Sequence, residues 1–328
     1  MKILVTGVGG QLGHDVMNEM ARRGLEGTGS DIAPEYSGVA DGSPVTQMPY
    51  VQLDITDETA VHAVLNEQRP DAVIHCAAWT AVDLAEDDDK VAKVRAINAD
   101  GTRYIAQACQ ELGCPMMYIS TDYVFDGQGE TPWDPDYTGY KPLNVYGQTK
   151  LEGELAVRDY APHYFIVRIA WVFGKNGRNY IRTMLNLGKT HDKLRIVSDQ
   201  IGTPTYTFDL ARLLVDMIQT DRYGYYHATN SELEPAVGGY NADGTRTGYI
   251  SWYDFSKEIF RQAAAMGHPE YLPENLALEA VTTEEYGVSK AKRPFNSRLD
   301  KSKLAVNGFT PLPDWADAVH RYLQEIEI

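Results

Sequence analysis

A glycine-rich turn between an apolar run and a helical pattern restricts the fold of this chain more than any other feature. Residues 2–6 are predicted to form a buried strand, Gly7-Val8-Gly9-Gly10-Gln11-Leu12-Gly13 a tight turn, and residues 11–23 a helix. The first glycine allows a sharp turn, the second lets backbone approach a pyrophosphate, and the third permits close helix–strand packing. The pattern predicts a dinucleotide site, and a plain strand–helix turn is the alternative.

Strand and helix patterns alternate through the first half of the chain. Strands are predicted at 26–31, 50–53, 72–77, 116–120 and 164–168, and helices at 57–68, 88–112 and 145–160. In the second half, helices are predicted at 178–189, 207–219, 252–266 and 313–326, and strands at 194–197 and 224–227. The alternation predicts an α/β fold: a doubly wound, parallel Rossmann-type sheet with helices on both faces.

The less regular second half predicts a smaller C-terminal substrate-binding lobe beside the sheet. Residues 1–165 are assigned to the nucleotide-binding Rossmann domain, with 195–230 returning to it. Residues 166–194 and 231–328 are assigned mainly to the lobe, and the Gly-rich stretch 232–248 to an extended loop that resembles an insertion.

The composition of the chain excludes several classes of partner. The formal net charge of −16 repels phosphate backbones and anionic lipid, so neither nucleic acid nor a membrane is expected. No apolar run reaches the roughly 18 residues of a membrane span. Cys76, Cys109 and Cys114 are odd in number and lack metal-ligand spacing, which predicts packing roles in a reduced, cytoplasmic protein.

Two acidic residues end predicted strands next to the glycine turn. Asp31 follows Gly13 by 18 residues, where a carboxylate accepts hydrogen bonds from the adenosine ribose and disfavours a 2′-phosphate. Asp31 therefore favours NADH over NADPH as the cofactor. Asp54 closes the third strand, where it meets the adenine amino group or caps the helix at 57; both roles remain open.

A Tyr-x-x-x-Lys unit, Tyr146 to Lys150, is the candidate proton donor. Four residues apart on a helix, the two side chains share one face, and a nearby ammonium favours the phenolate form of tyrosine. Such a tyrosine acts as a general acid or base near neutral pH. Alone the pair usually decorates a surface, but the glycine turn upstream favours catalysis. Thr121, at the end of the fifth strand, is the candidate partner hydroxyl, unless it serves to cap or turn the chain.

Several local motifs, in order along nearly the whole chain, resemble those of the extended short-chain dehydrogenase/reductases, and within them the dTDP-4-dehydrorhamnose reductases. Besides the glycine turn and the Tyr-x-x-x-Lys unit, they are residues 77–86 (AAWTAVDLAE), 120–127 (STDYVFDG), 142–147 (PLNVYG), 168–174 (RIAWVFG), 199–205 (DQIGTPT) and 293–299 (RPFNSRL).

The resemblance implies reduction of the 4-keto group of dTDP-4-dehydro-L-rhamnose by NADH or NADPH, with Tyr146 as general acid assisted by Lys150 and Thr121. It implies cofactor contacts from Gly7, Gly10, Gln11, Leu12, Gly13, Asp31, Asp54, Ile55, Ala77, Ala78, Thr80, Asn98, Tyr146 and Lys150, with Asn98 positioning the lysine through water. It implies substrate contacts from Ser120, Asp122, Val124, Trp171, Gln200 and Arg293.

Other functions of the same fold family remain as alternatives. Related sugar-nucleotide dehydratases carry Asp-Glu after the threonine, whereas here Asp122 is followed by Tyr123, so elimination is not expected. A nucleotide-sugar epimerase, or a regulatory subunit similar to the β subunit of methionine adenosyltransferase, stays open. Some family members bind Mg²⁺ at a homodimer interface. Asp15 occupies one matching position, but no partner carboxylates can be placed. A homodimer and bound Mg²⁺ therefore stay open, no metal ligand is assigned, and Asp15 is assigned to a solvated helix face.

Overall fold

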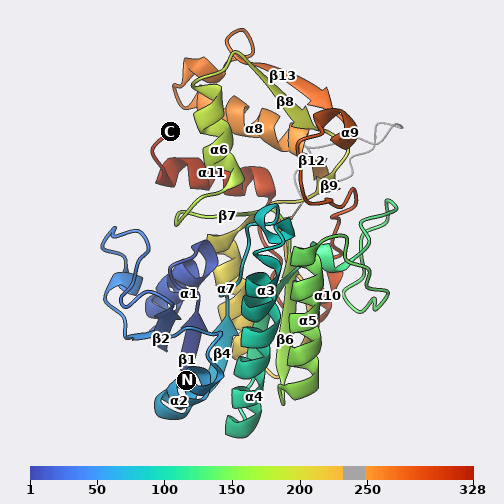
Figure 1. Ribbon diagram of the computed structural model, residues 1–328. Helices are drawn as coiled ribbons and strands as arrows, with labels where there is room; N and C mark the ends of the chain where they lie inside the picture. The colour runs from blue at the N-terminus through green and yellow to red at the C-terminus, as the bar shows by residue number, and fades with distance from the viewer. Residues whose placement is uncertain (232–247) are drawn as a thin grey trace.

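A seven-stranded parallel sheet forms the lower half of the computed structural model (Figure 1), which describes residues 1–231 and 248–328. The strand order is β11-β6-β5-β4-β1-β2-β3, and every neighbouring pair is parallel. The strands are β1 (Lys2–Thr6), β2 (Glu26–Asp31), β3 (Tyr50–Gln52), β4 (Ala72–His75), β5 (Met116–Thr121), β6 (Tyr164–Ile169) and β11 (Gly224–His227). The predicted doubly wound α/β sheet is confirmed.

Helices cover both faces of this sheet because alternate strand residues point to opposite sides. On one face α1 (Gln11–Arg22) packs against α7 (Thr207–Ile218) over a core that includes Ile3 and Val5. On the other face α2 (Glu58–Gln68), α4 (Thr102–Leu112) and α5 (Val145–Tyr160) cover a core that includes Leu4. Both layers bury apolar strand residues completely, as expected for a parallel sheet.

The helix predicted at 88–112 is interrupted. A short helix α3 (Val91–Arg95) leads into a π-helical turn η3 (Ala96–Gly101) before α4 begins. Gly101 lies at the end of this turn, where an added Cβ would stand 2.9 Å from the carbonyl oxygen of Ile55. Such π-turns are often found at functional sites, and periodicity alone does not reveal them.

A second lobe sits above the carboxyl ends of the strands (Figure 1). It contains α6 (Tyr180–Gly188), α8 (Trp252–Ala265), α11 (Trp315–Glu325) and the parallel pair β8 (Lys193–Val197) with β13 (Ala277–Val281) around its own apolar core. The return to the central sheet begins at α7 and continues with β11, whereas β8 pairs inside the upper lobe. The partner of β8 lies some 80 residues further on, so no local pattern places this strand.

Short elements complete both halves of the molecule. They are β7 (Val172–Phe173) paired with β10 (Thr205–Tyr206), β9 (Ile201–Gly202) paired with β12 (Ile250–Ser251), α9 (Thr283–Tyr286), α10 (Ser302–Val306) and the 3₁₀ turns η1 (Pro44–Thr46), η2 (Leu84–Glu86), η4 (Asp122–Val124) and η5 (Pro269–Tyr271). The loop predicted at 232–248 lies outside the described residues apart from Gly248. Within the part of the chain that the structure describes, no helix has the length and apolar character needed to cross a membrane.

Candidate active site

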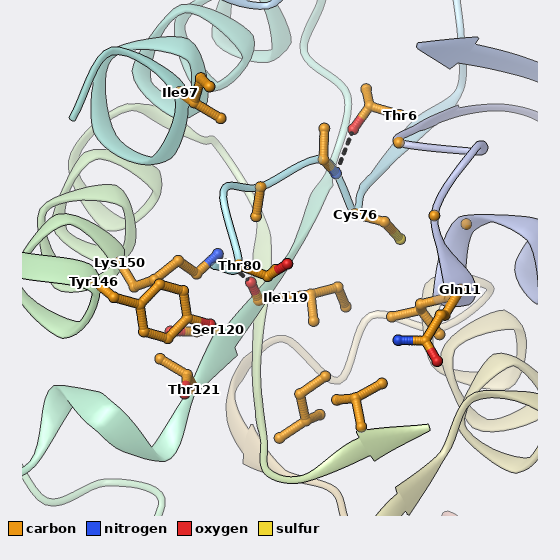
Figure 2. Close-up of a pocket in the computed structure, with 18 of the residues that line it drawn as sticks. Thr6, Gln11, Cys76, Thr80, Ile97, Ile119, Ser120, Thr121, Tyr146 and Lys150 are labelled. Carbon is orange, nitrogen blue, oxygen red and sulfur yellow. Dashed lines mark hydrogen bonds between the residues drawn. The ribbon is translucent and has the colours of Figure 1, made fainter. Parts of the chain in front are cut away.

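A cavity of about 860 Å³ opens where the carboxyl ends of the central strands face the upper lobe. The strand order reverses beside β1, and open α/β sheets bind ligands at such a switch point. Figure 2 shows Tyr146, Lys150, Ser120 and Thr121 gathered at one side and Gln11 at the other. The predicted residues that line it are Gly7, Gly10, Gln11, Leu12, Gly13, Asp31, Asp54, Ile55, Ala77, Ala78, Thr80, Ser120, Thr121, Asp122, Tyr146, Lys150 and Trp171.

The glycine turn has the geometry that the sequence predicts. Gly7 has a φ of +73°, and a Cβ there would stand 2.6 Å from the amide nitrogen of Ala77. A Cβ on Gly13 would stand 2.8 Å from the carbonyl carbon of Gly7. Gly10 is the N-cap of α1 and offers no side chain to the first helical amides, which leaves them for a ligand at the cavity. A helix N-terminus of this kind suits the pyrophosphate of a dinucleotide.

Two asparagines from the segment after β7 brace this turn from outside. The Asn176 amide donates to the carbonyl oxygens of Gly9 at 2.8 Å and Gly10 at 3.1 Å, and the Asn179 amide donates to Gln11 Oε1 at 3.1 Å. Both asparagines are buried. They lie more than 160 residues from the turn in sequence, which is why no pattern around the glycines predicts them.

The two acidic residues at the strand ends act differently from each other. Asp31 accepts from the Gly9 amide at 2.9 Å and from the Ile32 amide at 2.8 Å, so its carboxylate is fixed beside the turn. Asp54 accepts from the amide and hydroxyl of Thr56 at 2.9 and 2.7 Å. The alternative that Asp54 caps the helix at 57 is wrong, because Asp57 caps α2 by accepting from Ala60.

Tyr146 and Lys150 lie one turn apart at the start of α5. Asn144 fixes this helix end by accepting from the Gly147 amide at 2.8 Å. The Lys150 ammonium donates to the carbonyl oxygen of Ile119 at 2.7 Å and lies 4.1 Å above the centre of the Tyr118 ring. Lys150 is therefore held by the end of β5, on the same cavity wall as Tyr146.

Burial is the largest influence on the pKa of both Tyr146 and Lys150. It raises the pKa of Tyr146, while a hydrogen bond with Thr121 opposes that shift. It lowers the pKa of Lys150 to about 7, against the attraction of Glu154. The charge of Asp122 raises the pKa of the Tyr146 phenol further. The role of Lys150 in favouring the phenolate stays a prediction.

The polar residues that end β5 line the cavity next to Tyr146. The Thr121 hydroxyl donates to Asp122 Oδ1 at 3.0 Å, while the Ser120 hydroxyl is buried and has no hydrogen-bond partner among the described residues. Burial raises the pKa of Asp122 to about 6. A buried hydroxyl without a partner costs free energy, so Ser120 is suited to meet a polar ligand atom.

Four predicted site residues do not line the cavity. Asn98, in the π-helical turn, is buried behind it, where its side chain accepts from the Trp79 amide at 2.8 Å and donates to Thr149. Val124 is part of an apolar cluster. Gln200 donates to Thr283, and Arg293 forms an ion pair with Asp83 at 2.6 Å. Asn98 and Arg293 therefore hold the 77–86 segment rather than face the cavity.

Sequence analysis missed several cavity residues. They are Thr6, Ser30, Ile32, Leu53, Thr56, Cys76, Val82, Lys93, Ala96, Ile97, Ile119, Tyr123, Ile169, Ala170, Val172, Gly177, Arg178 and Trp252. Many of them adjoin predicted residues at strand ends, and that adjacency is the signal that could have found them. Lys93, Arg178 and Trp252 come from elements that only the tertiary fold brings to the cavity.

Asp15 was expected on a solvated helix face, and that expectation is wrong. It is buried between α1 and α7, where it accepts a hydrogen bond from the Thr207 hydroxyl, and burial raises its pKa to about 7. Across residues 1–231 and 248–328, no group of three or more His, Cys, Asp or Glu side chains is arranged to hold a metal ion.

Known proteins share this whole architecture. Residues 1–328 match the family described as the RmlD substrate binding domain. The dTDP-4-dehydrorhamnose reductase of Aggregatibacter actinomycetemcomitans is 34% identical over 325 residues, which cover 97% of each chain. Solved structures of dTDP-4-dehydrorhamnose reductases from Clostridium acetobutylicum, and from Bacillus anthracis with NADP, are 37% and 34% identical, each with a TM-score of 0.81 and 99% of both chains covered. This chain belongs to the dTDP-4-dehydrorhamnose reductase family.

Proposed function

We propose that this NAD(P)H-dependent oxidoreductase reduces the 4-keto group of dTDP-4-dehydro-L-rhamnose to give dTDP-L-rhamnose. The observation that carries the proposal is the placement of Tyr146 and Thr121 in the same cavity as the glycine turn. A proton donor and a dinucleotide-binding turn in one cavity are what the reduction of a carbonyl needs. Family membership supplies the substrate class.

The cavity fits a nicotinamide dinucleotide. Gly7, Gly10 and Gly13 line the cavity beside the first turn of α1 without side chains. The buried Ser120 hydroxyl, which has no hydrogen-bond partner among the described residues, lines it as well. We assign the pyrophosphate to the Gly10–Leu12 amides, the adenosine to Asp31 and Asp54, and the nicotinamide ribose to Lys150. Asp31 favours NADH, although the Bacillus anthracis relative was solved with NADP.

When bound, the reduced nicotinamide supplies the hydride for the ketone carbon. The Tyr146 hydroxyl then gives its proton to the ketone oxygen, so that C=O becomes CH–OH and no charge is left on the sugar. Thr121, which is hydrogen bonded to Tyr146, orients that oxygen. The Lys150 ammonium stabilises the phenolate that remains on Tyr146 until it regains a proton.

The residue after Asp122 separates reduction from elimination. Tyr123 lines the cavity and its ring meets the Tyr146 ring edge to face, with the centroids 5.5 Å apart. A tyrosine with a pKa raised by burial does not take the place of a second carboxylate base. This supports the reductase over a sugar-nucleotide dehydratase.

NADH oxidation with enzymatically prepared dTDP-4-dehydro-L-rhamnose tests the proposal, with the product identified by mass spectrometry and NMR. Tyr146→Phe should lower kcat by about 10²–10⁴, the usual contribution of a positioned general acid, while NADH still binds. Tyr137→Phe is the matched control, because Tyr137 is 45% exposed and outside the cavity. Unchanged turnover in Tyr146→Phe would remove the acid role. Cofactor that stays bound through repeated turnover would favour an epimerase.

A further inference from the structure

Two tryptophans from different halves of the molecule stack at the cavity. Trp171 follows β6 of the central sheet, and Trp252 is the first residue of α8 in the upper lobe. Their ring centroids are 3.8 Å apart with 19° between the planes, and both rings line the cavity. Aromatic pairs in contact stabilise a fold beyond simple burial.

The backbone of Trp171 is held in an unusual conformation. Its φ is +51°, in the left-handed region that side-chain-bearing residues rarely adopt. Thr205 fixes it from β10, because its amide donates to the Trp171 carbonyl at 3.1 Å and its hydroxyl donates to the Ala170 carbonyl at 2.6 Å. Such strain costs about 1–3 kcal/mol and collects at functional sites, so the orientation of this indole is built in.

The ring of Trp171 is enclosed on the lobe side by two neighbours. A Cβ on Gly202 would stand 3.3 Å from its Cε2, so the strand β9 passes close behind the indole. The β9–β12 pairing sets Ser251 opposite Ile201, and Ser251 caps α8 with a capping box. That register places Trp252, the residue after Ser251, against the ring of Trp171.

We propose that Trp252 is a positioning residue for the sugar: its indole holds Trp171 against the substrate end of the cavity, and the paired rings form a wall for a pyranose. This inference rests on the proposed function and deepens it. The apolar, electron-rich face of an indole suits the C–H face of a pyranose ring. Trp171 follows β6, and β5 and β4 separate β6 from the strand β1 that leads into the glycine turn. We therefore assign the wall to the sugar and not to the dinucleotide.

Four variants test the inference in the full-length protein. Trp252→Ala should raise the KM for dTDP-4-dehydro-L-rhamnose about tenfold, the order of a lost aromatic pair, with little change in kcat or in the KM for NADH. Trp252→Phe should restore most of the affinity. Trp252→Leu keeps apolar bulk without a stacking face and carries the test if the alanine variant does not fold. Tyr253→Ala, the next residue on α8 but outside the cavity lining, is the control.

Near-ultraviolet circular dichroism and calorimetric titration with dTDP-L-rhamnose supply independent readouts. Stacked indoles give a coupled signal, which Trp252→Ala and Trp252→Leu should abolish together with a matching loss of dTDP-L-rhamnose affinity. A lost signal with unchanged sugar affinity, or equal rises in both KM values, would overturn the inference alone. If the unmodified protein neither binds dTDP-L-rhamnose nor reduces the ketone, the proposed function falls and the inference falls with it.

Discussion

The two ends of the cavity are built from different materials. At the glycine turn, the backbone of one contiguous segment makes the surface, and missing Cβ atoms create its shape. At the tryptophan end, Trp171, which follows β6, meets Trp252 of α8 across the two halves of the molecule. The backbone end is suited to phosphate and ribose, which most dinucleotides share. The side-chain end is suited to the part of a substrate that differs between enzymes.

This difference separates what is generic from what is specific in the molecule. A backbone surface changes only if a glycine changes, so it tolerates little variation. A side-chain surface can be altered one residue at a time without disturbing the sheet. We expect substitutions at the first end to affect folding and cofactor together, and substitutions at the second to affect the sugar alone.

Gly13→Ala tests the backbone end and should have the largest effect. Its Cβ would stand 2.8 and 2.9 Å from backbone atoms of Gly7 and Val8, so α1 must move away from β1. We expect a loss of roughly 1–3 kcal/mol in stability and a rise of about 100-fold in the KM for NADH. Thermal unfolding and initial rates measure both. The KM for the sugar at saturating NADH is the internal control, and an equal rise there would contradict the division into two ends.

The pH dependence of kcat/KM tests the Tyr146–Lys150 pair, which serves both the cofactor and the sugar in the proposed mechanism. The Lys150 pKa is lowered to about 7 by burial, from an unfolded value near 10.5, so the charged form needed for catalysis prevails below about pH 7. The kcat/KM for the sugar should be flat below pH 7 and fall about tenfold per pH unit above it. Because the unfolded lysine keeps its proton longer, this group makes folding stability rise between pH 7 and 10.5. A limb above pH 9 would mean that Lys150 keeps its charge in the working enzyme.

Asn176→Ala tests whether the glycine-turn end of the cavity depends on backbone alone, since this side chain from the segment after β7 supports the turn. Removing it takes a buried donor from the Gly9 and Gly10 carbonyls, of which Gly10 keeps the His14 amide, and an acceptor from the Val39 amide, at a cost of about 1–3 kcal/mol. We expect about a tenfold higher KM for NADH and an unchanged KM for the sugar. Asn179→Ala is the comparison for the loss of a buried amide: it removes the bonds to Gln11, Gly174 and Tyr322 and the cap of α6 while those carbonyls stay paired. It should lower stability without the same rise in the KM for NADH. No change in Asn176→Ala would show that the turn holds its shape alone.

The sequence predicts the backbone end in most of its detail, for a physical reason. Gly10 and Gly13 act through packing within seven consecutive residues, and the positive φ of Gly7 is a local property, although its lack of a Cβ also makes room for Ala77. The strand ends at Asp31 and Thr121 follow from the same alternation, because parallel strands end at one edge. The strand β4 ends at His75, two residues before the predicted Ala77. The local sequence pattern therefore predicts the parallel sheet, the order of its strands and helices along the chain, and the residues at its carboxyl edge.

The local sequence pattern does not predict contacts between residues that are far apart in the sequence. Trp252 meets Trp171 through the β9–β12 pairing, and Asn176 meets Gly9 across the molecule. Burial is equally non-local: Asp15 has a polar neighbourhood in sequence, but α7 covers it, and the same effect raises the pKa of Tyr146. Arg293 belongs to a family motif, but its partner Asp83 draws it away from the cavity.

Substitutions of Asp31 should have the smallest effect. They separate two roles of this side chain at the glycine turn: its negative charge and its hydrogen bonds to the backbone. Its carboxylate accepts from the Gly9 and Ile32 amides, so it braces the turn. We propose that its negative charge also lies where a 2′-phosphate would bind. Asp31→Asn keeps an acceptor and removes the charge, whereas Asp31→Ala removes both. If charge decides cofactor choice, both variants should raise the NADPH-to-NADH ratio of kcat/KM about fivefold, the order of one partly screened charge interaction. If bracing decides it, Asp31→Asn should stay close to the unmodified protein while Asp31→Ala loses affinity for both cofactors alike. Only the first outcome would mean that Asp31 determines the preference between NADH and NADPH. It would show that one side chain sets cofactor specificity at the glycine-turn end of the cavity.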